Sequence, residues 1–291
     1  MQDKNFCTLT SFNSFEELLT KELSFSKSLI KKYISKKKLQ SSLREREEVF
    51  IPLEILNLGF VNPVYKGEEL EILKEDENFI AINKPKGIHG HPLSYGENST
   101  IVNFLRSRNS WSVFLDKSEQ AESGLLYRLD HETSGVLIFA KSKEIYQKVR
   151  GTFLESAKKK SYLAIVSGEF QLEGKHSHYL ESYGEKGARM RSCDSGEREV
   201  AIEVSLLKYD EKSDLSLLEI ELGQGVRHQI RCQLSTIGFP ILGDTLYEGT
   251  SSERVYLHAY KYEIRIEDIS FEVTSLKDEL FLKLFDLNSC F

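Results

Sequence analysis

The chain has 291 residues, 40% of them hydrophobic, with a formal net charge of −6 and a pI near 5.8. This length favours about two domains, and the apolar content is sufficient for globular cores, which excludes a disordered chain. The net negative charge argues against a protein that coats nucleic acid indiscriminately. No apolar block approaches the roughly 20 residues of a membrane helix, and residues 1–10 lack the pattern of a signal peptide. We expect a soluble cytoplasmic protein.

The sequence offers little for a metal or a nucleotide cofactor. Four scattered cysteines form no Cys-x-x-Cys pair, which argues against a zinc site and a disulfide framework. They are Cys7, Cys193, Cys232 and Cys290. Gly223 and Gly225 lack the third glycine of a dinucleotide-binding loop. The histidine pairs 89/91 and 176/178 have metal-ligand spacing, but no carboxylate or Cys cluster completes either set.

The first part of the chain predicts a small, partly helical unit. Residues 14–39 repeat apolar side chains at helical spacing in two runs, which predicts two short helices, the second capped by Ser26. Residues 40–58 are typical of an irregular insertion. Residues 60–73 predict a turn that leads into a strand.

A basic segment overlaps these helices. Between Lys21 and Arg46 stand nine Lys or Arg residues and only two Glu. A solvated helix face and a surface that contacts phosphates explain this excess equally well.

From residue 71 onward, short apolar strands are separated by Gly and Pro, with a few helical stretches between them. The predicted strands are 79–82, 136–140, 162–166, 200–207, 215–222 and 262–266. The predicted helices are 101–108, 143–154, 229–237 and 278–284. This order predicts one α+β domain in which helices cover a sheet.

Residues 124–142 contain the most informative pattern of the chain. Asp130 stands in a polar turn that runs directly into the apolar strand residues 136–139, with Arg128 two positions before it. Such a turn holds a single acid rigidly at the mouth of a sheet, as an active site requires. Taken alone, an Asp at this place is also an ordinary turn former.

Three further segments carry residues suited to chemistry. Asn83, Lys84 and Pro85 end a predicted strand, Tyr162 begins another, and Arg231 lies near the start of a predicted helix. Taken alone, the first is a strand ending in a Pro-Gly turn, the tyrosine is a core residue and the arginine is a surface residue.

Together, the four segments resemble the motifs of the RluA-type RNA pseudouridine synthases. Residues 128–135 match Arg-Leu-Asp-x-x-Thr-Ser-Gly, residues 83–87 match Asn-Lys-Pro-x-Gly, and residues 228–231 match His-Gln-Ile-Arg. The resemblance implies a pseudouridine synthase fold of α+β class over residues 74–291, with a mixed, mainly antiparallel sheet and a central cleft. Residues 1–73 resemble, in degenerate form, the small RNA-binding α/β domain named after ribosomal protein S-four.

The resemblance also implies roles for individual residues. Asp130 becomes the catalytic nucleophile, Tyr162 the active-site aromatic residue, and Arg231 the arginine that pairs with Asp130 and keeps it charged. Substrate contacts are implied for Arg128, Asn83, Lys84, His89 and Ile230. The reaction breaks the bond from uracil N1 to the ribose anomeric carbon and rejoins the base through C5. Because nothing is oxidised or consumed, we expect no cofactor and no metal.

Two departures from the family pattern affect the site. Tyr127 stands where the family usually has His, and a tyrosine stacks on a base but carries no charge at neutral pH. Arg227 is displaced by one position from an arginine that many relatives share, and such a shift changes the face to which a side chain points. We therefore assign Arg227 no family role.

Two other functions remain open at this point. A glycosidase-like hydrolase would use Asp130 with water, although no second carboxylate in a matched motif is available as general acid. A non-catalytic RNA-binding adaptor would keep the fold alone. The expected partner is RNA, with ribosomal RNA preferred over transfer RNA because of the N-terminal resemblance. We expect a monomer with no membrane association and no obligate protein partner.

Overall fold

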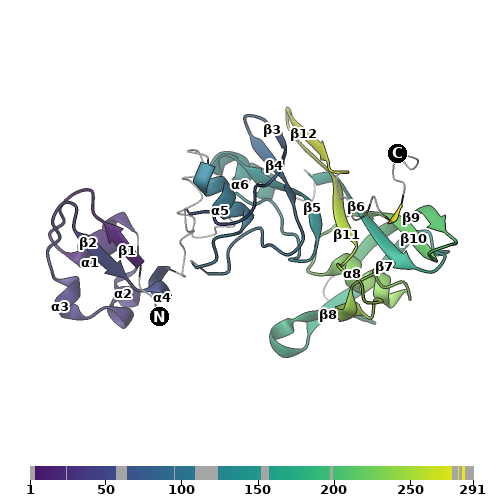
Figure 1. Ribbon diagram of the computed structural model, residues 1–291, viewed down its shortest axis with the longest axis horizontal. Helices are drawn as coiled ribbons and strands as arrows, with labels where there is room; N and C mark the ends of the chain where they lie inside the picture. The colour runs from purple at the N-terminus through teal and green to yellow at the C-terminus, as the bar shows by residue number, and fades with distance from the viewer. Residues whose placement is uncertain are drawn as a thin grey trace.

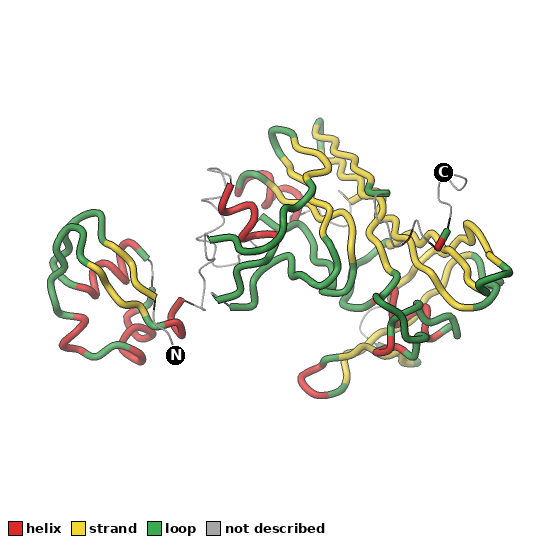
Figure 2. Tube along the Cα trace, viewed as in Figure 1, coloured by secondary structure: helices red, strands yellow, loops and turns green. Residues whose placement is uncertain are grey.

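The computed structural model describes residues 4–23, 25–56, 64–94, 96–108, 124–151, 157–196 and 199–276, together with residues 281, 284 and 285. Strands dominate the chain after residue 71, whereas helices fill much of the part before residue 57 (Figure 2). Among the described helices, none has the length and apolar character needed to cross a membrane.

The N-terminal unit has its own hydrophobic core, formed by buried side chains between Phe15 and Leu56. Strand β1 (Lys4–Cys7) pairs antiparallel with β2 (Glu48–Ile51). The helical segments are α1 (Phe15–Glu17), the π-helical turn η1 (Leu18–Glu22), α2 (Lys27–Tyr33), α3 (Lys36–Leu39) and α4 (Leu53–Leu56). Ser26 caps α2 as predicted, since its hydroxyl accepts a hydrogen bond from the Leu29 amide at 3.3 Å.

One expectation for this unit is wrong. Residues 40–58 are not an irregular insertion, because they contain β2 and α4. Val49 and Ile51 point into the core, while Glu48 and Phe50 are exposed, as expected of a strand that is buried on one face. The partner of this short strand lies at the start of the chain, so local pattern alone did not reveal it.

In the described part of the chain, the remaining strands form one sheet in the order β3-β4-β5-β11-β6-β10-β9-β7-β8, with β12 paired to β11. Their bounds are β3 Ile72–Glu75, β4 Phe79–Lys84, β5 Ser134–Ala140, β6 Ala157–Ser167, β7 Gly174–Tyr183, β8 Arg189–Cys193, β9 Glu199–Asp210, β10 Leu215–Leu222, β11 Leu257–Ile266 and β12 Ile269–Thr274. Of the described pairings only β5 with β11 is parallel. The predicted α+β class with a mainly antiparallel sheet is therefore confirmed.

The helices divide between the two halves of the sheet (Figure 1). Helices α5 (Ile101–Arg108) and α6 (Lys143–Gly151) lie over β3 to β5, and α8 (Gln229–Thr236) contacts β7, β8 and β9. Short 3₁₀ turns are η3 (Glu185–Gly187) and η4 (Thr245–Tyr247). Residues 60–63, 152–156 and most of the predicted helix 278–284 lie outside the described residues.

Strands β7 and β8 form a hairpin that the sequence did not predict. Their side chains are largely polar and are partly or fully exposed on both faces, so the strands lack the alternation that marks a half-buried strand. The hairpin is positioned by pairing of β7 with β9 and by contacts with α8.

The two halves of the sheet have separate hydrophobic cores that meet at the β5–β11 pair. Leu129 packs against both cores, so the turn that follows it is fixed at their junction. Gly135 permits the close approach of β11 to β5. Its φ is +110°, and an added Cβ would lie 2.2 Å from the Ala259 carbonyl oxygen.

We therefore expect Gly135→Ala to lower the free energy of unfolding by about 3–5 kcal/mol, because backbone strain and a steric clash act together. Gly168→Ala is the matched control: φ is +84° there, but nothing lies within 4 Å of an added Cβ. The control should lose only about 1–2 kcal/mol from strain. Urea denaturation of both variants measures the difference, and equal losses would contradict a clash with Ala259.

Candidate active site

The turn that carries Asp130 is fixed by hydrogen bonds to its backbone. The Thr133 amide donates to the Asp130 carbonyl oxygen at 3.1 Å, and the Gly87 amide donates to the His131 carbonyl oxygen at 2.9 Å. The Lys84 ammonium donates to the same His131 oxygen at 3.1 Å. These bonds fix the backbone of the turn, and the Asp130 side chain lines the cavity, where it is 25% exposed.

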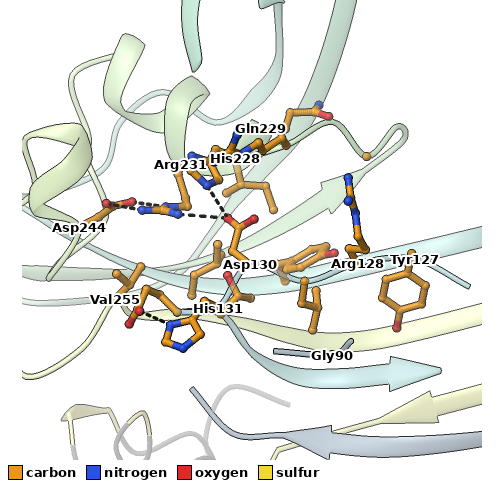
Figure 3. A pocket seen from close by; sticks show the side chains of 18 of the residues that line it. Gly90, Tyr127, Arg128, Asp130, His131, His228, Gln229, Arg231, Asp244 and Val255 are labelled. Atoms are coloured by element: carbon orange, nitrogen blue, oxygen red, sulfur yellow. Dashed lines mark hydrogen bonds and ion pairs between the residues drawn. The ribbon is translucent and has the colours of Figure 1, made fainter. Parts of the chain in front are cut away.

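Arg231, on α8, joins Asp130 to a second carboxylate. Its Nη1 lies 3.2 Å from Asp130 Oδ2. Its Nε and Nη2 donate to the two oxygens of Asp244 at 2.6 and 2.9 Å. The side chain of Asp244 is 1% exposed, and a buried carboxylate of this kind requires a paired cation. The bidentate pair fixes the plane of the guanidinium and directs its remaining nitrogen to Asp130 (Figure 3).

The charge of Arg231 is maintained by its two partners. Burial alone would lower the pKa of this guanidinium, but the hydrogen bond and charge of Asp244, together with the charge of Asp130, raise it. Arg231 is therefore a permanent cation beside Asp130. The sequence alone does not indicate this role of Asp244, because its partner cannot be read from spacing.

Tyr162, on β6, lines the same cavity as Asp130 and Arg231 and is 6% exposed. Burial, with a smaller contribution from the charge of Asp130, raises the pKa of its hydroxyl above the ordinary value. The hydroxyl is therefore neutral at physiological pH. It is able to donate a hydrogen bond, but it is not a free phenolate base.

The cavity has a volume of about 1270 Å³. This exceeds the roughly 300–1,000 Å³ of typical small-molecule sites. Six of the predicted site residues line it: Asp130, Tyr162, Arg231, Arg128, His89 and Ile230.

Asn83 and Lys84 are not among the described residues that line the cavity. Asn83 bonds instead to Glu71 and Ser275. Lys84 is completely buried behind the turn, where burial lowers its pKa to about 7 against the opposing charges of Asp130 and Glu132. The geometry gives Lys84 a supporting role for the backbone of the turn, in place of the substrate contact expected from the motif.

The histidines with metal-ligand spacing have other partners. His89 Nδ1 lies 2.6 Å from Glu97 Oε1, and its ring is 4.7 Å from that of His131. His178 Nδ1 lies 3.0 Å from Gln233 Nε2, and His176 Nε2 lies 2.7 Å from the Leu172 carbonyl oxygen.

Comparison with known proteins identifies the family of this chain. Residues 78–236, more than half of the chain, match the family described as RNA pseudouridylate synthase. The chain belongs to this family. The RluA-type resemblance seen in the sequence is thereby confirmed, as is the assignment as an RNA pseudouridine synthase, an isomerase that acts on RNA.

Two relatives illustrate the match. The relative named uncharacterized RNA pseudouridine synthase YhcT, from Bacillus subtilis, is 30% identical over 76% of this chain and 72% of its own length. The ribosomal large subunit pseudouridine synthase D of Borreliella burgdorferi is 33% identical over 70% of this chain and 63% of its own length.

Solved structures agree on the fold. Human RNA pseudouridylate synthase domain containing 1 superposes with a TM-score of 0.60 at 23% identity, over 77% of this chain and 90% of that chain. Human RNA pseudouridylate synthase domain containing 4 gives a TM-score of 0.54 at 22% identity, over 72% and 90% of the two chains.

Within this pseudouridine synthase, Tyr127 contacts strands β5 and β11. Its hydroxyl donates to the Val136 carbonyl oxygen at 2.8 Å, and its ring stacks on Tyr262 with centroids 4.1 Å apart and planes 5° apart. One face of the Tyr127 ring is thus covered by Tyr262. Arg128, the next residue, is exposed and points the opposite way (Figure 3).

The side chain of the displaced arginine, Arg227, bonds to the turn between β7 and β8. Its Nη1 donates to the Gly187 carbonyl oxygen at 2.8 Å and its Nη2 to the Ala188 carbonyl oxygen at 3.2 Å. Both oxygens belong to the turn between β7 and β8. Arg227 thus joins the cavity wall to the tip of this hairpin.

We predict that Arg231→Lys lowers the turnover of uridine isomerisation by about 100-fold or more while RNA affinity is largely retained. A lysine cannot hold both oxygens of Asp244 and also reach Asp130, so the acid loses its fixed direction. Turnover and RNA binding are measured on the same transcript.

Arg265→Lys is the matched control, because Arg265 is 64% exposed and does not line the cavity. It should keep the parental rate. Near-parental turnover of Arg231→Lys would contradict the pairing.

Proposed function

We propose that this RNA pseudouridine synthase isomerises specific uridines of ribosomal RNA with Asp130 as its nucleophile, assisted by Tyr162 and Arg231. The observation that carries the proposal is the Asp130 carboxylate, partly exposed in the cavity and oriented by a guanidinium that Asp244 holds in place. A single directed carboxylate is what attack on an anomeric carbon requires.

The proposed reaction follows from these groups. The bond from ribose C1′ to uracil N1 breaks, its electron pair leaves with the base, and Asp130 bonds to C1′ or stabilises its positive charge. The base turns, C5 bonds to C1′ as the carboxylate departs, and the proton on C5 is lost while N1 gains one. Tyr162 would stack on the base, and its neutral hydroxyl would donate a hydrogen bond to it.

Access to C1′ requires that the uridine leave its stack, which costs a few kcal/mol in a structured RNA. Arg128 is suited to fill the vacated space, because it is exposed and lies two residues from Asp130 on the cavity wall. His89 and Ile230 on the cavity wall would contact the extruded nucleotide.

The preference for ribosomal RNA rests on relatives and on charge. Three of the relatives, from Borreliella burgdorferi, Pseudomonas aeruginosa and Zymomonas mobilis, carry the name ribosomal large subunit pseudouridine synthase D. We also propose residues 1–73 as an RNA-binding domain of the S-four type. Exposed lysines on α2 and α3 support this, since they offer contacts to phosphates: Lys27, Lys31, Lys32, Lys36, Lys37 and Lys38.

The test compares the parent enzyme with Asp130→Asn on large-subunit ribosomal RNA from a strain that lacks the gene. The parent should form pseudouridine at discrete positions and release no free uracil. Asp130→Asn should form none while keeping RNA affinity, because the amide is nearly isosteric but cannot act as a nucleophile.

Asp268→Asn, an exposed change outside the cavity, should behave as the parent. Free uracil without pseudouridine would point to a hydrolase, and modification by Asp130→Asn would reject the nucleophile. The proposed target would be rejected if the parent enzyme bound ribosomal RNA without modifying it but formed pseudouridine in transfer RNA.

A further inference from the structure

The tip of the β7–β8 hairpin is joined to the cavity wall by three hydrogen bonds. Two come from Arg227, as described above. In the third, the Met190 amide donates to the Tyr247 hydroxyl at 2.9 Å. Tyr247 lies in η4, three residues after Asp244. The hairpin therefore contacts the same segment whose Asp244 binds Arg231.

The same hydroxyl contacts His228, which precedes α8. Tyr247 Oη lies 2.9 Å from His228 Nδ1, and the two rings are nearly perpendicular, at 87°. Because this oxygen already accepts the Met190 hydrogen, its own proton is available to Nδ1. With Nδ1 accepting, the neutral imidazole carries its proton on Nε2. His228 Nε2 is the atom that faces Asp130, 3.8 Å from Oδ2.

The backbone conformation of His228 is unusual for a non-glycine residue. Its φ is +51° and its ψ 21°, the left-handed region that costs a non-glycine residue of order 1 kcal/mol or more. Although it occupies the N-cap position of α8, its side chain makes no capping bond. The side chain instead lies against the cavity, 11% exposed, and approaches Asp130 beside Arg231 (Figure 3).

The surroundings of His228 keep the imidazole neutral. Burial lowers its pKa, the charge of Asp130 opposes this, and Arg231 and Arg227 add to it. Asp244 opposes it weakly, and Tyr247 is the remaining titratable group in direct contact. A neutral Nε2–H beside Oδ2 complements Arg231 on the same oxygen without neutralising the acid.

We propose that Tyr247 and His228 are positioning residues that make the orientation of the Asp130 carboxylate depend on docking of the β7–β8 hairpin. The inference rests on the proposed role of Asp130. When the hairpin is docked, Met190 fixes the Tyr247 hydroxyl, Tyr247 fixes the imidazole tautomer, and Asp130 faces an N–H group. When the hairpin lifts, the hydroxyl turns away and this N–H is no longer fixed.

The central test is Tyr247→Phe, which keeps the ring over the Arg231 guanidinium, 5.2 Å from its centroid, and removes only the hydroxyl. We expect kcat to fall about 10-fold with KM for RNA unchanged, since transition-state geometry and not binding is affected. The acid limb of the pH–rate profile should move to higher pH, because the lost donor no longer favours the neutral imidazole. A merely structural loss would not move this limb.

A second readout does not depend on RNA chemistry. Hydrogen exchange of residues 184–190 should accelerate in Tyr247→Phe, and also in Arg227→Gln, which removes the other two bonds to the hairpin tip. Tyr209→Phe removes an exposed hydroxyl outside the cavity and should change neither exchange nor rate.

Faster exchange with parental kcat and an unchanged pH profile in Tyr247→Phe would overturn the coupling. Unchanged exchange in both variants would overturn the docking step. A parent that modifies no ribosomal RNA, with exchange altered as expected, would reject the proposed target and leave the docking step supported.

Discussion

The site depends on one guanidinium shared by two carboxylates. Arg231 lies 101 residues from Asp130 and 13 from Asp244, and it contacts both. Asp244 is buried and would be unstable there without a cation, so it holds Arg231 firmly. The remaining guanidinium nitrogen, Nη1, orients the carboxylate of Asp130. Two of these three hydrogen bonds thus join Arg231 to the buried Asp244, and the third reaches the partly exposed Asp130.

This arrangement also explains why the two halves of the sheet must meet accurately. Asp130 comes from the β4–β5 half and Arg231 from the half that carries α8, so their distance is set at the β5–β11 junction. Leu129 belongs to both cores, and Gly135 lets β11 approach. Lys84 fixes the intervening turn from behind. Packing around the junction therefore sets the distance between Asp130 and Arg231.

Much of this could be predicted from the sequence where buried apolar runs or motif order carried the information. Strand β10 was predicted with its observed bounds, and Asp130, Tyr162 and Arg231 were expected in one site, where the structure brings them together. The hairpin β7–β8 was missed because its polar residues have no period.

The supporting partners were beyond sequence reasoning for a different reason. The roles of Asp244 and Lys84 depend on atoms that approach only in the folded chain, and neither spacing nor residue type indicates them. Lys84 was expected at the substrate because its motif resembles a substrate-binding segment, yet its buried ammonium bonds to a backbone carbonyl.

The crystal structure of the enzyme with an RNA whose target uridine carries fluorine at C5 tests the central claim most directly. We predict an extruded base against Tyr162 and a ribose C1′ bonded to Asp130 or within about 3.5 Å of its carboxylate. A target uridine bound in the cavity with C1′ directed away from Asp130 would contradict the account.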